Sequence, residues 1–171
     1  MNYPLSIKNN LIIYNKSIIA VYELDPVDLF ILPESDQEIF IKDMGNTLNS
    51  IKDSEIQIIM RTRNALPEDL NTHLNTFNKF EEDMTINKTL IQKYSEDLTE
   101  LISKNIIPIK EYFLLIKQNC EVSKSEQLTK GINSLERKVS RIFNNINATG
   151  IGLKQITGKD LDKFLITFTR S

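Results

Sequence analysis

The stretch Ala148–Asp160, which reads ATGIGLKQITGKD, is the part of the sequence that most resembles a nucleotide site. A phosphate-binding loop follows G-x-x-x-x-G-K-[ST]: backbone N–H groups surround the phosphates, the lysine reaches the terminal ones and the hydroxyl binds Mg²⁺. Aligned on Gly158 and Lys159, this pattern places Leu153 at its first glycine and Asp160 at its hydroxyl. Two of the four fixed positions therefore do not match.

The expected order of elements around these glycines favours a structural role. We expect Gly150 to follow the end of a helix, Gly152 to begin a short strand over 151–156, and Gly158-Lys159 to lead into a final helix. An aspartate directly after that pair would occupy the positive end of the helix dipole, which a phosphate would otherwise use. A nucleotide-binding protein that uses Gly158-Lys159 is kept as the less favoured alternative.

The remaining potentially reactive residues do not form a recognisable catalytic motif in the sequence. The sequence has one histidine, His73, and one cysteine, Cys120, which excludes a disulfide framework and leaves almost no basis for a zinc site. We expect His73 on a helix surface and Cys120 to be a structural or surface thiol. The motifs of serine hydrolases, zinc proteases and dinucleotide-binding folds are missing from the sequence. We therefore predict no catalytic, cofactor-binding or metal-binding residues, no cofactor and no enzymatic activity.

The composition is that of an ordinary globular protein. With 171 residues, 40% of them hydrophobic and 26% charged, we predict a single domain over 1–171. With a formal net charge of -2, the protein has no overall electrostatic attraction to nucleic acid or anionic lipid. A signal-peptide pattern is missing, and the apolar runs are far shorter than the ~20 residues that span a bilayer. These features predict a cytoplasmic protein.

Hydrophobic periodicity predicts the elements of the first third. Strands are expected over 11–14 and 17–24, joined by a two-residue turn at Asn15-Lys16 in which the asparagine adopts a positive φ. A capping box at Ser35-Asp-Gln-Glu38 predicts a helix over about 35–52. A β-branched strand is expected over 55–61.

A helical excursion is predicted over about 66–105. Its apolar residues recur at helical spacing, and its length indicates either two helices folded as a hairpin, with a break near 85–88, or one long helix with an apolar seam. We expect its apolar stripe to pack on the protein's own sheet, with docking on a partner as the alternative. After it we expect a strand over 111–118 and an amphipathic helix over 122–147.

Five basic residues suggest nucleic-acid binding as an alternative function. Arg61, Arg63, Arg137, Lys138 and Arg141 could contact phosphates in a small nucleic-acid-binding adaptor of a mobile element. Nearby glutamates dilute this charge, and the aromatic residues that stack on bases are not interleaved with it. Nucleic acid is therefore not the expected partner.

The predicted order is β-β-α-β-αα-β-α-β-α. When the first strand and the helical excursion are set aside, two βαβ units remain. We predict an α+β fold: a ferredoxin-like split βαβ–βαβ sheet, with an extra N-terminal hairpin strand and an inserted long helical hairpin.

The succession of short segments resembles the TraC-like N-terminal domain of VirB-class type IV secretion ATPases, the motors of bacterial conjugation. The resemblance covers nearly the whole chain, and its most specific part is LNSI followed by IQI and RTR. The segments that carry it are Pro4–Ile7, Leu11–Tyr14, Ala20–Leu24, Glu34–Glu38, Leu48–Ile51, Ile56–Ile58, Arg61–Arg63, Lys110–Ile116, Leu135–Arg137, Gly152-Leu153, Leu161 and Phe164.

The resemblance implies a non-catalytic role. In the family this domain precedes a RecA-like ATPase with Walker motifs, whereas this sequence stops after Arg170-Ser171. It implies a structural component of a conjugative type IV secretion system, acting in DNA transfer by a plasmid or conjugative element of Gram-positive bacteria. The implied partners are the motor ATPase or inner-membrane channel proteins at the cytoplasmic face of the membrane, and a second copy of the chain is a further candidate. Whether the chain is an independent protein or the front of a longer motor stays open.

Overall fold

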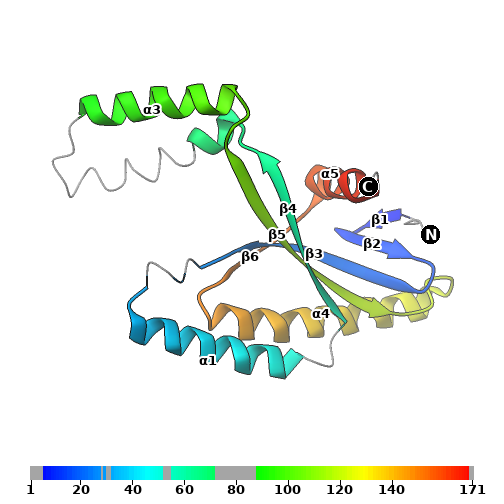
Figure 1. Ribbon diagram of the computed structural model, residues 1–171. Helices are drawn as coiled ribbons and strands as arrows, with labels where there is room; N and C mark the ends of the chain where they lie inside the picture. The colour runs from blue at the N-terminus through cyan, green and yellow to red at the C-terminus, as the bar shows by residue number, and fades with distance from the viewer. Residues whose placement is uncertain (1–5, 28, 30–31, 52–54, 72–87, 170–171) are drawn as a thin grey trace. The chain divides into compact units, whose positions relative to one another are not determined.

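The structure, a computed structural model, describes residues 6–27, 29, 32–51, 55–71 and 88–169 (Figure 1). It is an α+β protein, as the sequence predicts, with one antiparallel sheet. The chain forms two compact units. Unit 1 comprises Met1–Ile59 and Tyr112–Ser171, and unit 2 comprises Met60–Glu111.

The sheet has six strands in the described residues, in the order β1-β2-β3-β5-β4 with β6 also beside β3. β3 is its central strand, and it pairs with β5 from Ser17 to Leu24. Its other edge is shared, since β2 pairs with the first part of β3 and β6 with the last. The strands are β1 (Ser6–Lys8), β2 (Leu11–Tyr14), β3 (Ser17–Asp25), β4 (Ile56–Asn64), β5 (Pro108–Asn119) and β6 (Gly152–Gln155).

The N-terminal hairpins confirm one prediction and correct another. Tyr14 pairs with Ser17, so the two-residue turn between β2 and β3 is present as predicted. The left-handed backbone expected at Asn15 occurs instead at Asn9 and Asn10, with φ of 53° and 59°. These two asparagines connect β2 to β1, a strand that was not predicted. Asparagine tolerates this conformation better than other side chains, which suits a two-residue hairpin turn.

Three helices belong to unit 1: α1 (Glu34–Ile51), α4 (Ser125–Asn147) and α5 (Gly158–Thr169). They confirm the predicted helices to within a few residues. The predicted capping box is wrong, because α1 begins before Ser35 and the Ser35 hydroxyl donates to Asp36 Oδ1 at 3.2 Å. The amide of Asp36 donates to the Pro33 carbonyl at 2.9 Å. A serine inside the first turn cannot act as the N-cap of the same helix.

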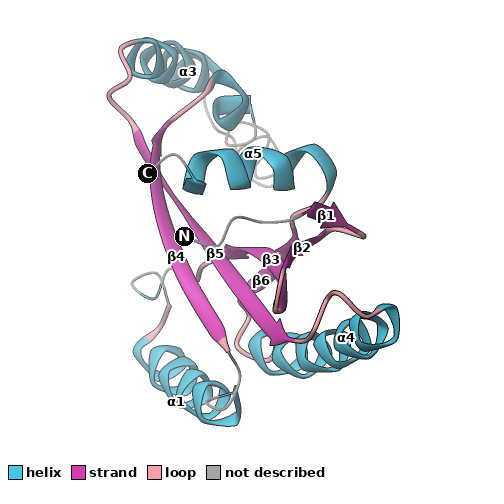
Figure 2. Cartoon of the chain, turned by 90° about the vertical axis from the view of Figure 1, so that its right-hand side faces the viewer, coloured by secondary structure: helices cyan, strands magenta, loops and turns pink. Residues whose placement is uncertain are grey.

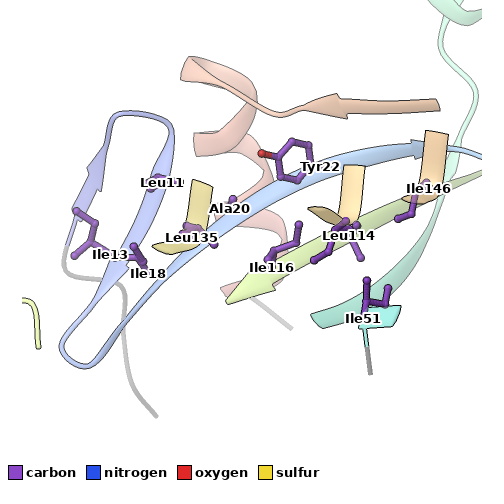
Figure 3. Packing of buried hydrophobic residues seen from close by; sticks show 11 residues of the cluster. Leu11, Ile13, Ile18, Ala20, Tyr22, Ile51, Leu114, Ile116, Leu135 and Ile146 are labelled. Carbon is purple, nitrogen blue, oxygen red and sulfur yellow. The ribbon is translucent and has the colours of Figure 1, made fainter. Parts of the chain in front are cut away.

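Two apolar clusters lie on opposite faces of the sheet in unit 1. α1 and α4 lie on one side of the sheet and α5 on the other (Figure 2). On the first side Leu135 of α4 packs with Ile18 and Leu114 of the central strands (Figure 3). On the second side Phe164 of α5 meets Phe113 edge to face, with ring centroids 5.0 Å apart. The side chains of both clusters are removed from water, which is the dominant favourable term in folding.

Unit 2 contains residues 60–64 of β4, a helical segment at 67–71, α3 (Lys88–Ser103) and residues 108–111 of β5. The Ala65 amide donates to the Ile107 carbonyl at 2.9 Å. Helical structure is therefore present at both ends of the predicted excursion. The predicted break near 85–88 begins in the undescribed segment, which ends at residue 87, and His73 also lies outside the described residues.

Candidate functional site

The backbone amide of Gly158 has a partner within this chain. Gly158 begins α5 with a φ of 53°, and its N–H donates to Asn10 Oδ1 at 3.2 Å. Lys159 is exposed, and Asp160 Oδ1 lies 3.5 Å from Lys163 Nζ. A phosphate-binding loop needs its amides free to face the ligand. Here one of those amides ties the start of α5 to the β1–β2 turn.

The other two glycines of this segment have structural reasons of their own. Gly150 follows α4 with a φ of 80°, a left-handed conformation that glycine adopts without strain. Gly152 pairs with Asp25 across the sheet, where an added Cβ would lie 3.0 Å from the Asp25 Cβ. The segment therefore forms a helix end, a strand and a helix start, as the sequence predicts.

Cys120 lies against α4 rather than in an open site. A Cβ added to Gly131 would stand 2.7 Å from the Cys120 Cβ, so this glycine permits the close approach. Burial raises the pKa of the Cys120 thiol, which disfavours the thiolate needed for nucleophilic chemistry. No group of three or more metal-ligating side chains is found among the residues that the structure describes.

The two strand arginines of the predicted basic set are bound by acidic side chains in unit 2. Glu111 receives both: Arg61 Nε donates to its Oε2 at 2.6 Å and Arg63 Nε donates to its Oε1 at 2.6 Å. The Glu111 side chain is only 14% exposed. A carboxylate shared in this way satisfies donors that a nucleic-acid phosphate would need. Sequence reasoning missed Glu111, which β5 supplies from the neighbouring strand.

Arg63 also forms a bidentate ion pair with Asp69, at the start of the helical segment. Its Nη1 and Nη2 atoms lie 2.7 and 2.8 Å from the two carboxylate oxygens. Asp69 Oδ2 in addition accepts the Leu66 amide at 2.6 Å. The hydrogen bond from Arg63 lowers the pKa of the Asp69 carboxyl, and the same bond raises the pKa of Arg63. We call Arg61, Arg63, Asp69 and Glu111 the charged cluster of unit 2.

The other three predicted bases belong to α4 in unit 1. Lys138 Nζ donates to the Lys117 carbonyl at 2.8 Å, and burial lowers the pKa of this lysine. Arg137 and Arg141 are exposed. The structure thus assigns Arg61 and Arg63 to one unit and Arg137, Lys138 and Arg141 to the other.

Unit 2 also carries exposed apolar residues, and three of them lie on segments joined by backbone hydrogen bonds. The Ile106 amide donates to the Leu101 carbonyl at 3.1 Å, and Ala65 bonds to Ile107, so the backbones at 65–66, 101 and 106–107 lie close together. Leu66 is 50% exposed, Leu101 39% and Ile106 57%. Tyr94, two turns before Leu101 on α3, is 40% exposed. We call Leu66, Tyr94, Leu101 and Ile106 the apolar surface of unit 2.

Comparison with protein-family models, with curated proteins and with solved structures gives no match to this chain. Among the residues that the structure describes, no helix combines the length and the apolar character needed to cross a membrane.

Proposed function

We propose that the chain is a non-catalytic interaction component of a bacterial conjugative type IV secretion system. In this proposal the apolar surface of unit 2 docks on the motor ATPase or on an inner-membrane channel protein. The observation that carries it is the grouping of exposed Leu66, Leu101 and Ile106 around one set of backbone hydrogen bonds. Apolar side chains grouped on a surface are a common mark of a binding site.

The charged cluster supports this role by fixing the segment that presents Leu66. Asp69 accepts the Leu66 amide and is itself held by Arg63, which is held in turn by Glu111. A docking surface held in its bound shape before binding loses less conformational freedom when the partner arrives. The charged cluster is thus proposed as the support of the apolar surface.

The resemblance of the sequence segments to the TraC-like domain supports the choice of system. We infer that four strands form a ferredoxin-like split βαβ arrangement in the order β6-β3-β5-β4, with α1 between β3 and β4 and α4 between β5 and β6. β1 and β2 would then be additions at one edge. The helical excursion would be an insertion between β4 and β5. The proposed location is the cytoplasmic face of the membrane, reached through the partner.

The test is direct binding to the motor ATPase and channel proteins encoded by the same conjugative element. We expect saturable binding by calorimetry, weakened at least about tenfold by Leu101→Glu because a charge would be buried without a counter-ion. The matched control is Ile166→Glu on α5, since Ile166 is similarly exposed but lies in unit 1. Equal weakening by both variants, or no binding by the unaltered chain, would contradict the proposal.

A further inference from the structure

A hollow of about 440 Å³ lies in unit 1, at the β2–β3 turn. Its walls come from three adjacent strands. Tyr14 of β2 pairs with Ser17 of β3, which pairs in turn with Asn119 of β5. Paired residues on adjacent strands project to the same face, so these side chains form one row across the sheet. Ile19 and Lys117 form a second row beside it, and Asn15-Lys16 close the end.

Two of the residues that line this hollow, Lys16 and Lys117, carry ammonium groups, and the other polar side chains can both donate and accept hydrogen bonds. Asn119 Nδ2 donates to both carboxylate oxygens of Glu55, at 2.8 and 2.9 Å, and Lys117 Nζ lies 3.7 Å from the same carboxylate. Two of the lining residues, Lys117 and Asn119, therefore already contact a carboxylate, that of Glu55, which does not itself line the hollow. By contrast, the Lys16 ammonium and the Ser17 hydroxyl form no hydrogen bond or ion pair with another residue in the described part of the chain.

The hollow also has an apolar part. Ile19 and Tyr14 are half-buried there and belong to the margin of the cluster beneath α5. Ser17, which also lines the hollow, is a buried polar residue that is 7% exposed. A volume of this size falls within the range of about 300–1,000 Å³ that holds small organic molecules. Apolar walls with a few placed polar groups are the usual make-up of such sites.

We propose that this hollow binds a small organic anion, with its carboxylate or phosphate head group on Lys16 and Ser17 and its apolar body against Ile19 and Tyr14. Lys16 supplies the charge, because Glu55 already compensates Lys117. Charge-assisted hydrogen bonds of this kind are stronger than neutral ones. The site lies wholly in unit 1, so it is independent of the docking proposed for unit 2 and can succeed or fail separately.

The experiment is an amide-resolved NMR titration of the full chain with phenyl phosphate, benzoate and inorganic phosphate. We expect saturable shifts at Tyr14, Ser17 and Asn119 with one or both organic probes, and weaker binding of inorganic phosphate because it lacks the apolar body. Lys16→Met should weaken the organic anion about tenfold, as the loss of one charged hydrogen bond predicts. Lys154→Met, which removes an exposed lysine on β6, should leave the affinity unchanged.

Three outcomes would overturn the proposal. The first is the absence of saturable shifts at these amides with either organic probe. The second is equal weakening by Lys16→Met and Lys154→Met, which would indicate nonspecific charge attraction. The third is inorganic phosphate binding as tightly as phenyl phosphate, which would remove the role of Ile19 and Tyr14. The amide spectrum of each variant, compared with that of the unaltered chain, checks that the fold is retained.

Discussion

Unit 1 and unit 2 are each stabilised internally by a different kind of interaction. Unit 1 buries apolar side chains on both faces of its sheet, with Leu135, Ile142 and Leu161 at most 1% exposed. Among the described residues of unit 2, the buried apolar side chains are Ala65 and Ile102. Unit 2 instead has a charged cluster of two arginines and two carboxylates.

This difference sets how each unit should respond to its surroundings. Burial of apolar surface changes little with pH or with moderate salt, whereas partly exposed ion pairs are weakened by both. Loss of the charged cluster should therefore loosen unit 2, including its ends of β4 and β5, while the apolar clusters of unit 1 stay intact. We therefore expect changes in pH and salt to alter the stability of unit 2 more than that of unit 1.

The largest expected effect is in unit 1. Leu135→Ala should lower the free energy of unfolding by about 2–5 kcal/mol, because it leaves a cavity where α4 packs on the sheet. Urea unfolding measured by circular dichroism checks this. Ile166→Ala on α5 is the control, with an expected change within about 0.5 kcal/mol for an exposed side chain. Similar losses in the two variants would show that Leu135 is not a core residue.

The next largest effect concerns the support of unit 2. Glu111→Gln removes the charge shared by Arg61 and Arg63, and should lower the free energy of local opening by about 1–2 kcal/mol once partial exposure is allowed for. Amide hydrogen exchange at 60–64 and 109–111 is the measurement, with amides of α4 as the internal reference.

The matched control for Glu111→Gln is Glu100→Gln, which removes an exposed ion pair between Glu100 of α3 and Lys104, the residue after this helix. It should change local exchange by less than about 0.5 kcal/mol. If Glu111→Gln accelerated exchange in α4 as much as in unit 2, the proposed difference between the units would be lost.

A smaller effect should follow pH. The folded-state pKa of Asp69 is lowered from its ordinary value of 3.8, so its stabilising contribution is fully present above that value and is lost as the pH falls through the lowered pKa. Protection of the Leu66 amide should therefore decline in acid below pH 3.8. Asp69→Asn should remove most of this pH dependence, and NMR titration of the Asp69 carboxyl gives its pKa directly. A titration at or above the ordinary value would contradict the ion pair.

The smallest effect is expected at an exposed ion pair in unit 1. Lys130 Nζ lies 2.7 Å from Glu126 Oε1 on the solvent side of α4, and both side chains are largely exposed. Lys130→Gln should cost about 0.5 kcal/mol or less, and this small cost should vanish at high salt. Urea unfolding at low and high salt tests it. A loss above about 1 kcal/mol at low salt that disappears at high salt would mean that surface charge matters in unit 1 too.

Local patterns predicted much of the fold. α4 follows from the helical spacing of its apolar residues, and the β2–β3 hairpin follows from two apolar runs separated by Asn15-Lys16. β1 was missed because a strand of three residues, Ser6–Lys8, is too short to show alternation. Its Asn9-Asn10 turn was the available signal, since paired asparagines suit a left-handed hairpin turn.

The sites were harder to predict because they depend on pairing between distant strands. Arg61 and Arg63 looked like candidate phosphate ligands, and only the neighbouring strand shows that Glu111 binds both. The hollow needs the pairing of Ser17 with Asn119, which no local pattern reveals. By contrast, the roles of Gly150 and Gly158, which have left-handed backbone, were predicted correctly. The ends of a helix are determined by neighbouring residues in the sequence.

The shared edge of β3 has a consequence for how this chain folds during synthesis. β2 can pair with β3 at once, but the rest of that edge waits for β6, and Gly158 of α5 bonds to Asn10 across a separation of 148 residues. At ~5–20 residues per second, a ribosome needs roughly 6–25 s to make the 127 residues that separate Asp25 from its partner Gly152 in β6. During this interval β3 presents unpaired N–H and C=O groups to other nascent chains. Chaperone demand should therefore depend on the late arrival of both β5 and β6, the two strands that complete the pairing of β3.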